Sequence, residues 1–273
     1  MHISEWIIRS TARIECTKRD GKCSIGTGFY FMFYDNFKQR IPVLVTNKHV
    51  IKDSFQGKIH VSIMDNNQNL IIGRYETVII DDFENKFIMH PEDNIDLCIL
   101  PMFESIKRVR KPGEEVCFAP FTAEQIPVGT WKDELKAIEE IIMVGYPSGI
   151  WDDINNLPII RRGITATPIG VDYCGNKEFL VDVACFPGSS GSPVLIFNDG
   201  IYTKKSGDTI IDNRILFIGI LSKLYQTIQG TIKKIDLPTT YEAQVQMPIN
   251  LGIAISAEKV LDFNDILLGM LKC

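Results

Sequence analysis

The residues best suited to covalent chemistry are the serines of a short loop at residues 186–194, which reads FPGSSGSPV. A Gly/Ser/Pro loop between two strand-like segments can turn sharply, expose a hydroxyl and direct backbone N–H groups into the same space. Such loops are also ordinary turns of β proteins. A serine nucleophile therefore needs two further groups, a base within hydrogen-bond reach and a residue that orients this base.

Histidine is the most common base, and the chain has four of them: His2, His49, His60 and His90. His2 lies near the end of the chain, His60 is expected on the outward face of an alternating strand, and His90 precedes a proline in a polar loop. His49 follows an apolar strand that runs into a Thr-Asn turn, and functional residues commonly lie at such strand ends. Taken alone, a histidine in this place is more often an ordinary core or surface residue.

The carboxylate that could orient such a base is Asp96, which immediately precedes the apolar segment at residues 97–100. Burying a carboxylate at the start of an apolar strand is costly unless it has a partner. The alternative for Asp96 is a strand-end cap or a solvated turn residue.

The serine loop does not fit the α/β-hydrolases, whose nucleophile lies in a G-x-S-x-G turn between a strand and a helix. In this loop Ser192 stands in place of the last glycine, and the following PVLIF segment at residues 193–197 is typical of a strand. A serine esterase on another fold is therefore the weakest of the enzyme hypotheses.

The elements that must position these residues are short β-rich segments closed by Gly, Pro, Asn or Asp. They fall at residues 28–34, 42–46, 58–64, 96–100, 141–144, 179–185, 193–197 and 215–221. Regular short strands predict a sandwich or a barrel. Helices are expected only at residues 131–140 and at residues 256–271, where Ser256 would be the N-cap.

In this order along the chain, the segments resemble the trypsin-like serine peptidases, and within them the HtrA-like bacterial branch. The similar segments are GTGF at 26–29, VTNKHV at 45–50, DLCIL at 96–100, VGYPSG at 144–149, DVACFPGSSGSP at 182–193, FIGI at 217–220 and GIAI at 252–255. The resemblance implies an all-β, chymotrypsin-like fold of two six-stranded antiparallel β-barrels with a short C-terminal helix. The N-terminal barrel would occupy residues 1–120 and carry His49 and Asp96. The C-terminal barrel would occupy residues 121–273 and carry Ser190.

The resemblance also implies a role for each residue. Ser190 would be the nucleophile, His49 the general base and then the general acid, and Asp96 the orienting carboxylate. The backbone N–H groups of Gly188 and Ser190 would form the oxyanion hole. These roles predict a serine endopeptidase that cleaves protein or peptide substrates through an acyl-enzyme, with no cofactor and no metal.

Several positions depart from the pattern of the family. Ser189 replaces the usual Asn or Asp, and Ser192 replaces a glycine, but the G-x-S-G-x-P pattern still selects Ser190 as the nucleophile. The chain has no Ile-Val-Gly-Gly activation terminus, so activation by N-terminal cleavage is not expected. No PDZ-like module is expected after residue 260.

The primary specificity pocket is expected to have Ala184 at its base, because the resemblance assigns that place to the position six before the nucleophile. A preference for Lys or Arg needs a buried carboxylate there. Ala184 therefore predicts cleavage after a small or medium apolar side chain.

Composition and charge bear on nucleic-acid binding, on membrane insertion and on the compartment of the protein. The net charge of −5 argues against a general nucleic-acid surface, and the basic KRVRK run at residues 107–111 is interpreted as a solvated turn. The longest apolar stretches are too short to cross a membrane. Seven cysteines without a C-x-x-C pair, and the lack of a secretory signal, favour a cytoplasmic protein.

The alternative hypothesis is a latent or degenerate trypsin-like domain that keeps the fold and acts as a partner-binding module. For the peptidase, a regulatory protein partner is expected, since a peptidase in the cytoplasm would need restraint.

Overall fold

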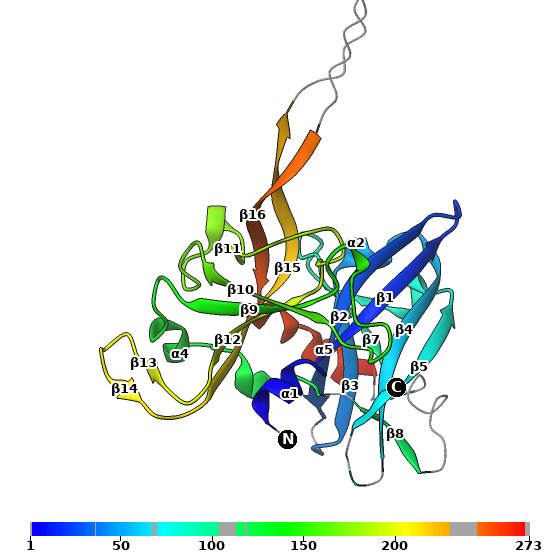
Figure 1. Cartoon of the computed structure of the whole chain (residues 1–273), viewed down its shortest axis with the longest axis horizontal. Coiled ribbons are helices and arrows are strands. Elements are labelled where there is room, and N and C mark those ends of the chain that lie inside the picture. Colours follow the sequence, from blue (N-terminus) through cyan, green and yellow to red (C-terminus); the bar gives the residue numbers. More distant parts are fainter. Residues whose placement is uncertain are drawn as a thin grey trace, which may run out of the picture.

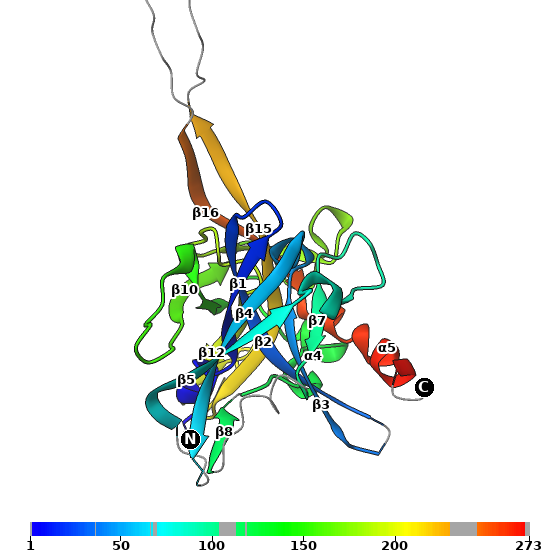
Figure 2. The same cartoon turned by 90° about the vertical axis from the view of Figure 1, so that its right-hand side faces the viewer.

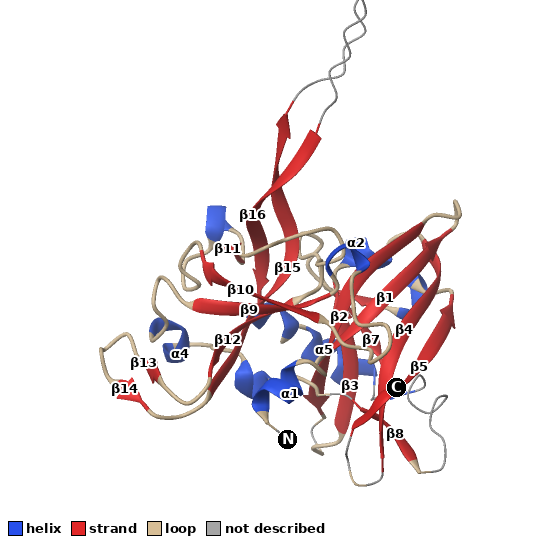
Figure 3. Cartoon of the chain, in the orientation of Figure 1, coloured by secondary structure: helices blue, strands red, loops and turns tan. Residues whose placement is uncertain are grey.

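A computed structural model describes residues 2–35, 37–65, 67, 70–103, 113–117, 119–229 and 245–270 of the chain. Strands dominate these residues (Figure 3). The basic run at residues 107–111 lies outside the described residues. Within the described parts, no helix is long and apolar enough to span a lipid bilayer.

Eight strands from the N-terminal part of the chain form one antiparallel sheet. They are β1 (Thr11–Lys18), β2 (Cys23–Tyr34), β3 (Arg40–Thr46), β4 (Ser54–Asp65), β5 (Leu70–Asp81), β6 (Ile88–Met89), β7 (Cys98–Pro101) and β8 (Glu114–Cys117). The strand order is β5-β4-β1-β2-β3-β7-β6, and β8 pairs with β4. The pairing of β3 with β7 matters most for the site, because it joins segments that are far apart in the sequence.

Six later strands close into a barrel in the order β10-β11-β16-β15-β12-β9. They are β9 (Glu140–Gly145), β10 (Ile159–Thr165), β11 (Glu178–Asp182), β12 (Pro193–Asn198), β15 (Arg214–Gln229) and β16 (Val245–Ser256). β15 and β16 continue beyond the barrel as a two-stranded ribbon (Figure 1 and Figure 2). A separate hairpin pairs β13 (Tyr202–Thr203) with β14 (Thr209–Ile210).

The predicted fold class is confirmed: the chain is mostly β, with a closed six-stranded antiparallel barrel, a second antiparallel sheet, a short C-terminal helix and a chymotrypsin-like fold. The N-terminal part was expected to be a second six-stranded barrel, and its described strands instead form an eight-stranded sheet.

An apolar core lies between the sheet and the barrel and holds them together. Phe29 of β2 lies 5.0 Å from Phe217 of β15, and Phe217 stacks on Phe121 at 5.0 Å, measured between ring centroids. All three rings are fully buried. Because aromatic pairs in close-packed cores resist rearrangement, side chains from the two halves can share one site at fixed distances.

Helices are few and short among the described residues. They are α1 (Ile3–Ile7), α2 (Lys48–Ile51), α4 (Thr130–Asp133) and α5 (Phe263–Met270), with 3-10 turns η1 (Glu84–Lys86), η2 (Ala123–Gln125), η3 (Pro147–Gly149), η4 (Tyr173–Gly175) and η5 (Ala257–Val260). In α5 the side chains of Phe263 and Leu267 pack against the core between sheet and barrel.

Two helix predictions need correction. The helix expected at residues 131–140 is a single turn, α4, because Leu135 instead packs into the barrel core and Glu139 is buried in an ion pair with Arg214. The helix expected at residues 256–271 is divided into η5 and α5, and the side chain of Ser256 makes no cap hydrogen bond.

Candidate active site

His49 lies in α2, the single helical turn that follows β3. Val50 and Ile51 in the same turn are buried, so the turn is fixed by its apolar side while the imidazole stays accessible, with 46% of its side-chain surface exposed. Asn47 precedes the turn and donates its side-chain amide to the backbone carbonyl of Asp96 at 2.8 Å. The strand end that carries the imidazole is thus tied directly to the segment that carries the carboxylate.

Asp96 precedes β7, and the pairing of Thr46 with Cys98 across β3 and β7 brings it beside His49. His49 Nδ1 and Asp96 Oδ2 are 2.6 Å apart, and the backbone N–H of His49 donates to Asp96 Oδ1 at 3.1 Å. Burial alone raises the pKa of Asp96, but hydrogen bonds from His49 and Ser222 outweigh it and hold this pKa below its usual value. The carboxylate is therefore ionised at neutral pH and keeps a proton on His49 Nδ1.

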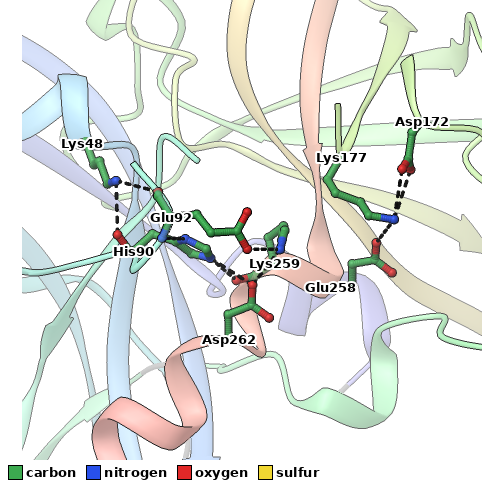
Figure 4. Close-up of polar contacts among 8 residues, drawn as sticks. All are labelled: Lys48, His90, Glu92, Asp172, Lys177, Glu258, Lys259 and Asp262. Atoms are coloured by element: carbon green, nitrogen blue, oxygen red, sulfur yellow. Dashed lines mark hydrogen bonds and ion pairs between the residues drawn. The ribbon is translucent and has the colours of Figure 1, made fainter. Parts of the chain in front are cut away.

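The loop before Asp96 is anchored by a cluster of charged residues (Figure 4). Lys48 Nζ donates to the carbonyls of His90 and Glu92 at 3.3 and 3.2 Å. Lys259 Nζ lies 2.7 Å from a Glu92 carboxylate oxygen and 2.8 Å from one of Asp262. His90 Nε2 in turn lies 3.2 Å from Asp262. Lys259 and Asp262, near the C-terminal end of the chain, thus hold the loop that precedes Asp96.

The other two described histidines of the sheet region, His60 and His90, are both buried. His90 is 2% exposed, and burial is the main cause that lowers its pKa. His60 is 9% exposed, because Trp151, from a loop of the C-terminal half, covers it at 4.9 Å between ring centroids. His60 Nε2 lies 3.2 Å from Glu15, and burial chiefly lowers the pKa of His60 to about 4. His60 thus lies on the face of β4 opposite the core residues Ile59 and Val61, as expected, but Trp151 covers this face and keeps it from solvent.

The serine loop lies between β11 and β12 of the barrel, and its three serines differ in accessibility. Ser189 and Ser192 are fully buried, whereas Ser190 is partly exposed. Gly191 has a φ of +87°, and a Cβ at this position would overlap the backbone oxygen of Thr27. The turn therefore requires glycine immediately after Ser190, and the geometry favours Ser190 as the reactive hydroxyl.

Ser222 links the serine loop to the carboxylate, and the sequence analysis did not identify it. Its hydroxyl donates to Asp96 Oδ2 at 2.7 Å, and its backbone carbonyl accepts from Ser190 Oγ at 3.5 Å. The described residues include both His49 and Ser190, and no hydrogen bond joins these two in the structure. A serine at the end of the apolar strand at residues 215–221 was the only sequence signal available for Ser222.

The backbone of the serine loop orients two N–H groups. The carbonyl of Pro187 accepts from the N–H of Ser148 at 2.6 Å, and that of Ser189 accepts from the N–H of Ser192 at 3.0 Å. Because the C=O and N–H of one trans peptide point in opposite directions, these bonds direct the N–H groups of Gly188 and Ser190 away from them. Among the described residues, neither N–H donates to another protein group. Both donors are available to a bound oxyanion.

Ala184 follows β11 and is partly exposed, and its carbonyl accepts a hydrogen bond from Arg161 at 2.9 Å.

In the described parts of the chain, no group of three His, Cys, Asp or Glu side chains is arranged to hold a metal ion.

The solved structures that this chain matches include proteases. The structure of the HtrA-type protease AlgW with tripeptide is 16% identical over 97% of this chain, with a TM-score of 0.47. The serine endoprotease from Yersinia pestis is 15% identical over 97% of this chain, with a TM-score of 0.45. The chain covers 62% and 65% of these two proteins, less than two thirds of their length.

No curated protein matched this sequence. The family model described as the trypsin-like peptidase domain matches residues 26–200, a range that includes His49, Asp96 and Ser190. Because this match extends over well more than half of the 273 residues, the chain belongs to the trypsin-like peptidase family.

Proposed function

We propose that this protein is a serine endopeptidase in which Ser190, His49 and Asp96 cleave peptide bonds through an acyl-enzyme. The observation that carries this proposal is the 2.6 Å hydrogen bond between His49 and an ionised Asp96, which Ser222 connects to Ser190. An imidazole held by a carboxylate near an accessible serine is the arrangement that activates a hydroxyl for acyl transfer.

The acylation step begins when the Ser190 hydroxyl turns from the Ser222 carbonyl toward His49. This movement is a rotation about one side-chain bond between staggered rotamers. His49 Nε2 then takes the hydroxyl proton as Ser190 Oγ bonds to the substrate carbonyl carbon, and Asp96 stabilises the imidazolium that forms. When the C–N bond breaks, His49 returns the proton to the leaving amine.

The carbonyl oxygen of the substrate becomes negatively charged in this step. The N–H groups of Gly188 and Ser190 donate to it, and their fixed orientation means that little reorganisation is needed as the charge develops. In the second half of the reaction, His49 takes a proton from a water molecule as that water attacks the acyl carbon. His49 then gives the proton to Ser190 Oγ as the acyl C–O bond breaks and the carboxylic acid leaves.

The substrate proposed is a protein or peptide with a small or medium apolar side chain at the cleavage position. Ala184 offers no carboxylate for Lys or Arg, and the guanidinium of Arg161 lies against the Ala184 carbonyl. A cationic substrate side chain would be repelled there. Efficient cleavage of a peptide library only after Lys or Arg would contradict this preference.

A regulatory protein partner and a cytoplasmic location also remain proposals. The location is supported by the cysteines, because the six in the described residues are free thiols and four of them are buried. Fractionation of the source cells with an antibody to the chain tests this location.

The test of the proposed activity is labelling with a fluorophosphonate probe, followed by intact mass and peptide mapping. Wild-type protein should gain one adduct on Ser190. The Ser190→Ala and His49→Ala variants should gain none at the same probe concentration. Ser206→Ala, which changes an exposed serine of the β13–β14 hairpin, is the matched control and should label like wild type.

The alternative function gives a different result. Well-folded wild-type protein that forms no adduct, alone or with added cell extract, would contradict the endopeptidase and favour the partner-binding module. An adduct on Ser206 or another surface serine would also contradict the proposed site.

A further inference from the structure

Arg161 is a partly buried cation that takes no part in the proposed proton transfers and bond changes. It lies in β10 between Ile160 and Arg162, which are both exposed, whereas Arg161 itself is only partly exposed. Two of its nitrogen atoms, Nε and Nη2, are fully buried and have no hydrogen-bond partner in the described parts of the chain. Burial is the main cause that lowers the pKa of Arg161 to about 10, so the group still carries its charge at neutral pH.

Within the described residues, both hydrogen bonds of Arg161 go to the segment that leads into the nucleophile. Its third nitrogen, Nη1, donates to Ser189 Oγ at 2.6 Å and to the Ala184 carbonyl at 2.9 Å. One NH₂ group of the guanidinium therefore joins the two ends of the turn at residues 184–189. Hydrogen bonds from a charged donor are roughly twice as strong as neutral ones, which makes this a firm anchor for a neutral serine.

The same turn sets the direction of the two N–H groups proposed for the oxyanion hole. Within it, the N–H of Ser189 donates to the Phe186 carbonyl at 3.0 Å, and the N–H of Phe186 approaches Ser189 Oγ at 3.4 Å. Ser189 Oγ therefore accepts from two donors, Nη1 of Arg161 and the backbone N–H of Phe186. Moving Ser189 would rotate the peptide that carries the Ser190 N–H and shift its neighbour Gly188.

We propose that Arg161 is a positioning residue for the nucleophile loop, which acts through Ser189 and Ala184 to hold the N–H groups of Gly188 and Ser190 in the orientation that stabilises the oxyanion. This inference rests on the proposed endopeptidase function. In this proposal, β10 of the barrel supplies the cation that bonds to the serine loop.

The test compares Arg161→Met with Arg162→Met. Methionine keeps much of the side-chain length but removes the charge and the donors. Arg162 is the matched control, since it is the next residue on the same strand and its side chain is 72% exposed in a surface ion pair with Glu140. The rate constant for fluorophosphonate labelling of Ser190 should fall about 10²-fold in Arg161→Met, the usual effect of a misplaced oxyanion donor. It should stay unchanged in Arg162→Met.

Two readouts separate positioning from a general loss of structure. A peptide aldehyde with alanine at the cleavage position forms a hemiacetal oxyanion on Ser190, so its affinity should fall in parallel with kcat/KM while KM stays nearly constant. In Arg161→Ala, the space left by the side chain should admit guanidinium ion. Millimolar guanidinium should then restore labelling, whereas the same concentration of urea should not.

The outcomes are distinguishable. Labelling of Arg161→Met at the wild-type rate would overturn the inference and leave the endopeptidase intact. The same conclusion would follow if kcat and KM changed by the same factor while the affinity for the aldehyde stayed at the wild-type value. If Arg161→Met does not fold, Ser189→Ala, which removes only the acceptor, takes its place and should also lower kcat while KM is kept. Wild-type protein that does not label would overturn both the proposed function and this inference.

Discussion

Replacing Ser222 with alanine removes one hydrogen-bond donor from a carboxylate that is largely buried. The Ser222 hydroxyl donates to Asp96 Oδ2 at 2.7 Å, and the Asp96 side chain is only 21% exposed, so water cannot fully replace the donor. A hydrogen bond to a charged group contributes about 1.5–3 kcal/mol. We therefore expect Ser222→Ala to lower the free energy of unfolding at neutral pH by this amount.

The energy of this one hydrogen bond also limits how far Ser222→Ala can lower kcat/KM. Asp96 keeps its two hydrogen bonds with His49 in the variant, at 2.6 and 3.1 Å, so the imidazole remains oriented. If the whole loss appeared in the transition state, kcat/KM would fall by about 10- to 10²-fold, since each ~1.4 kcal/mol is a factor of ten. A larger loss would mean that Ser222 has a role beyond supporting the carboxylate.

The assay is urea unfolding in a Ser190→Ala background, which prevents self-cleavage, with and without Ser222→Ala. Ser192→Ala is the matched control, because it is also a buried serine but its hydroxyl makes a neutral, longer bond of 3.3 Å to Thr27. Ser192→Ala should lower the free energy of unfolding by only about 0.5–1.5 kcal/mol.

The pH dependence of this difference gives a second check. The folded state holds the pKa of Asp96 below its unfolded value of about 3.9, so the stabilisation is fully present above that pH. It is lost as pH falls through the folded pKa, and the difference between the variants should shrink there. A cost for Ser222→Ala no larger than that of Ser192→Ala, with no dependence on pH, would refute the reasoning.

Three further predictions concern the site. Asp96→Asn should lower kcat by about 10⁴-fold, because an amide does not hold the Nδ1 proton of His49 as the carboxylate does; activity within tenfold of wild type, at equal thermal stability, would contradict the orienting role. The kcat/KM of wild type should rise with pH near neutrality, because a histidine base must lose its proton before it can accept one from Ser190, and Asp96, whose pKa is lowered, makes no contribution there; a flat profile would exclude a histidine base. Gly191→Ala should destabilise the fold by about 2–5 kcal/mol, because the position has a positive φ and a Cβ there would overlap Thr27. Gly200→Ala is the control: its φ is +88° but no atom lies near, so it should destabilise the fold by only about 1–2 kcal/mol in the same thermal unfolding experiment.

The strands were predictable because their signals are local. Apolar segments such as residues 42–46 and 193–197 are closed by turn residues, and they form β3 and β12 in the structure. The helix at residues 131–140 was mispredicted for the opposite reason: its helical spacing is overridden by the burial of Leu135 and by the ion pair of Glu139 with the distant Arg214. Intrinsic propensity is a weak signal when tertiary contacts oppose it.

By itself, the sequence determined the β class of the fold, the three residues worth testing and the order in which they occur, since these follow from residue type and from motifs that are contiguous in the chain. Only the tertiary structure decided which groups touch. The meeting of His49 with Asp96 depends on the pairing of β3 with β7. The accessibility of Ser190 between two buried serines, and the contacts made by Ser222 and Arg161, likewise come from segments that lie tens of residues apart. Such contacts leave no periodicity or spacing in one sequence, because they form only when the barrel closes and the core between barrel and sheet is packed.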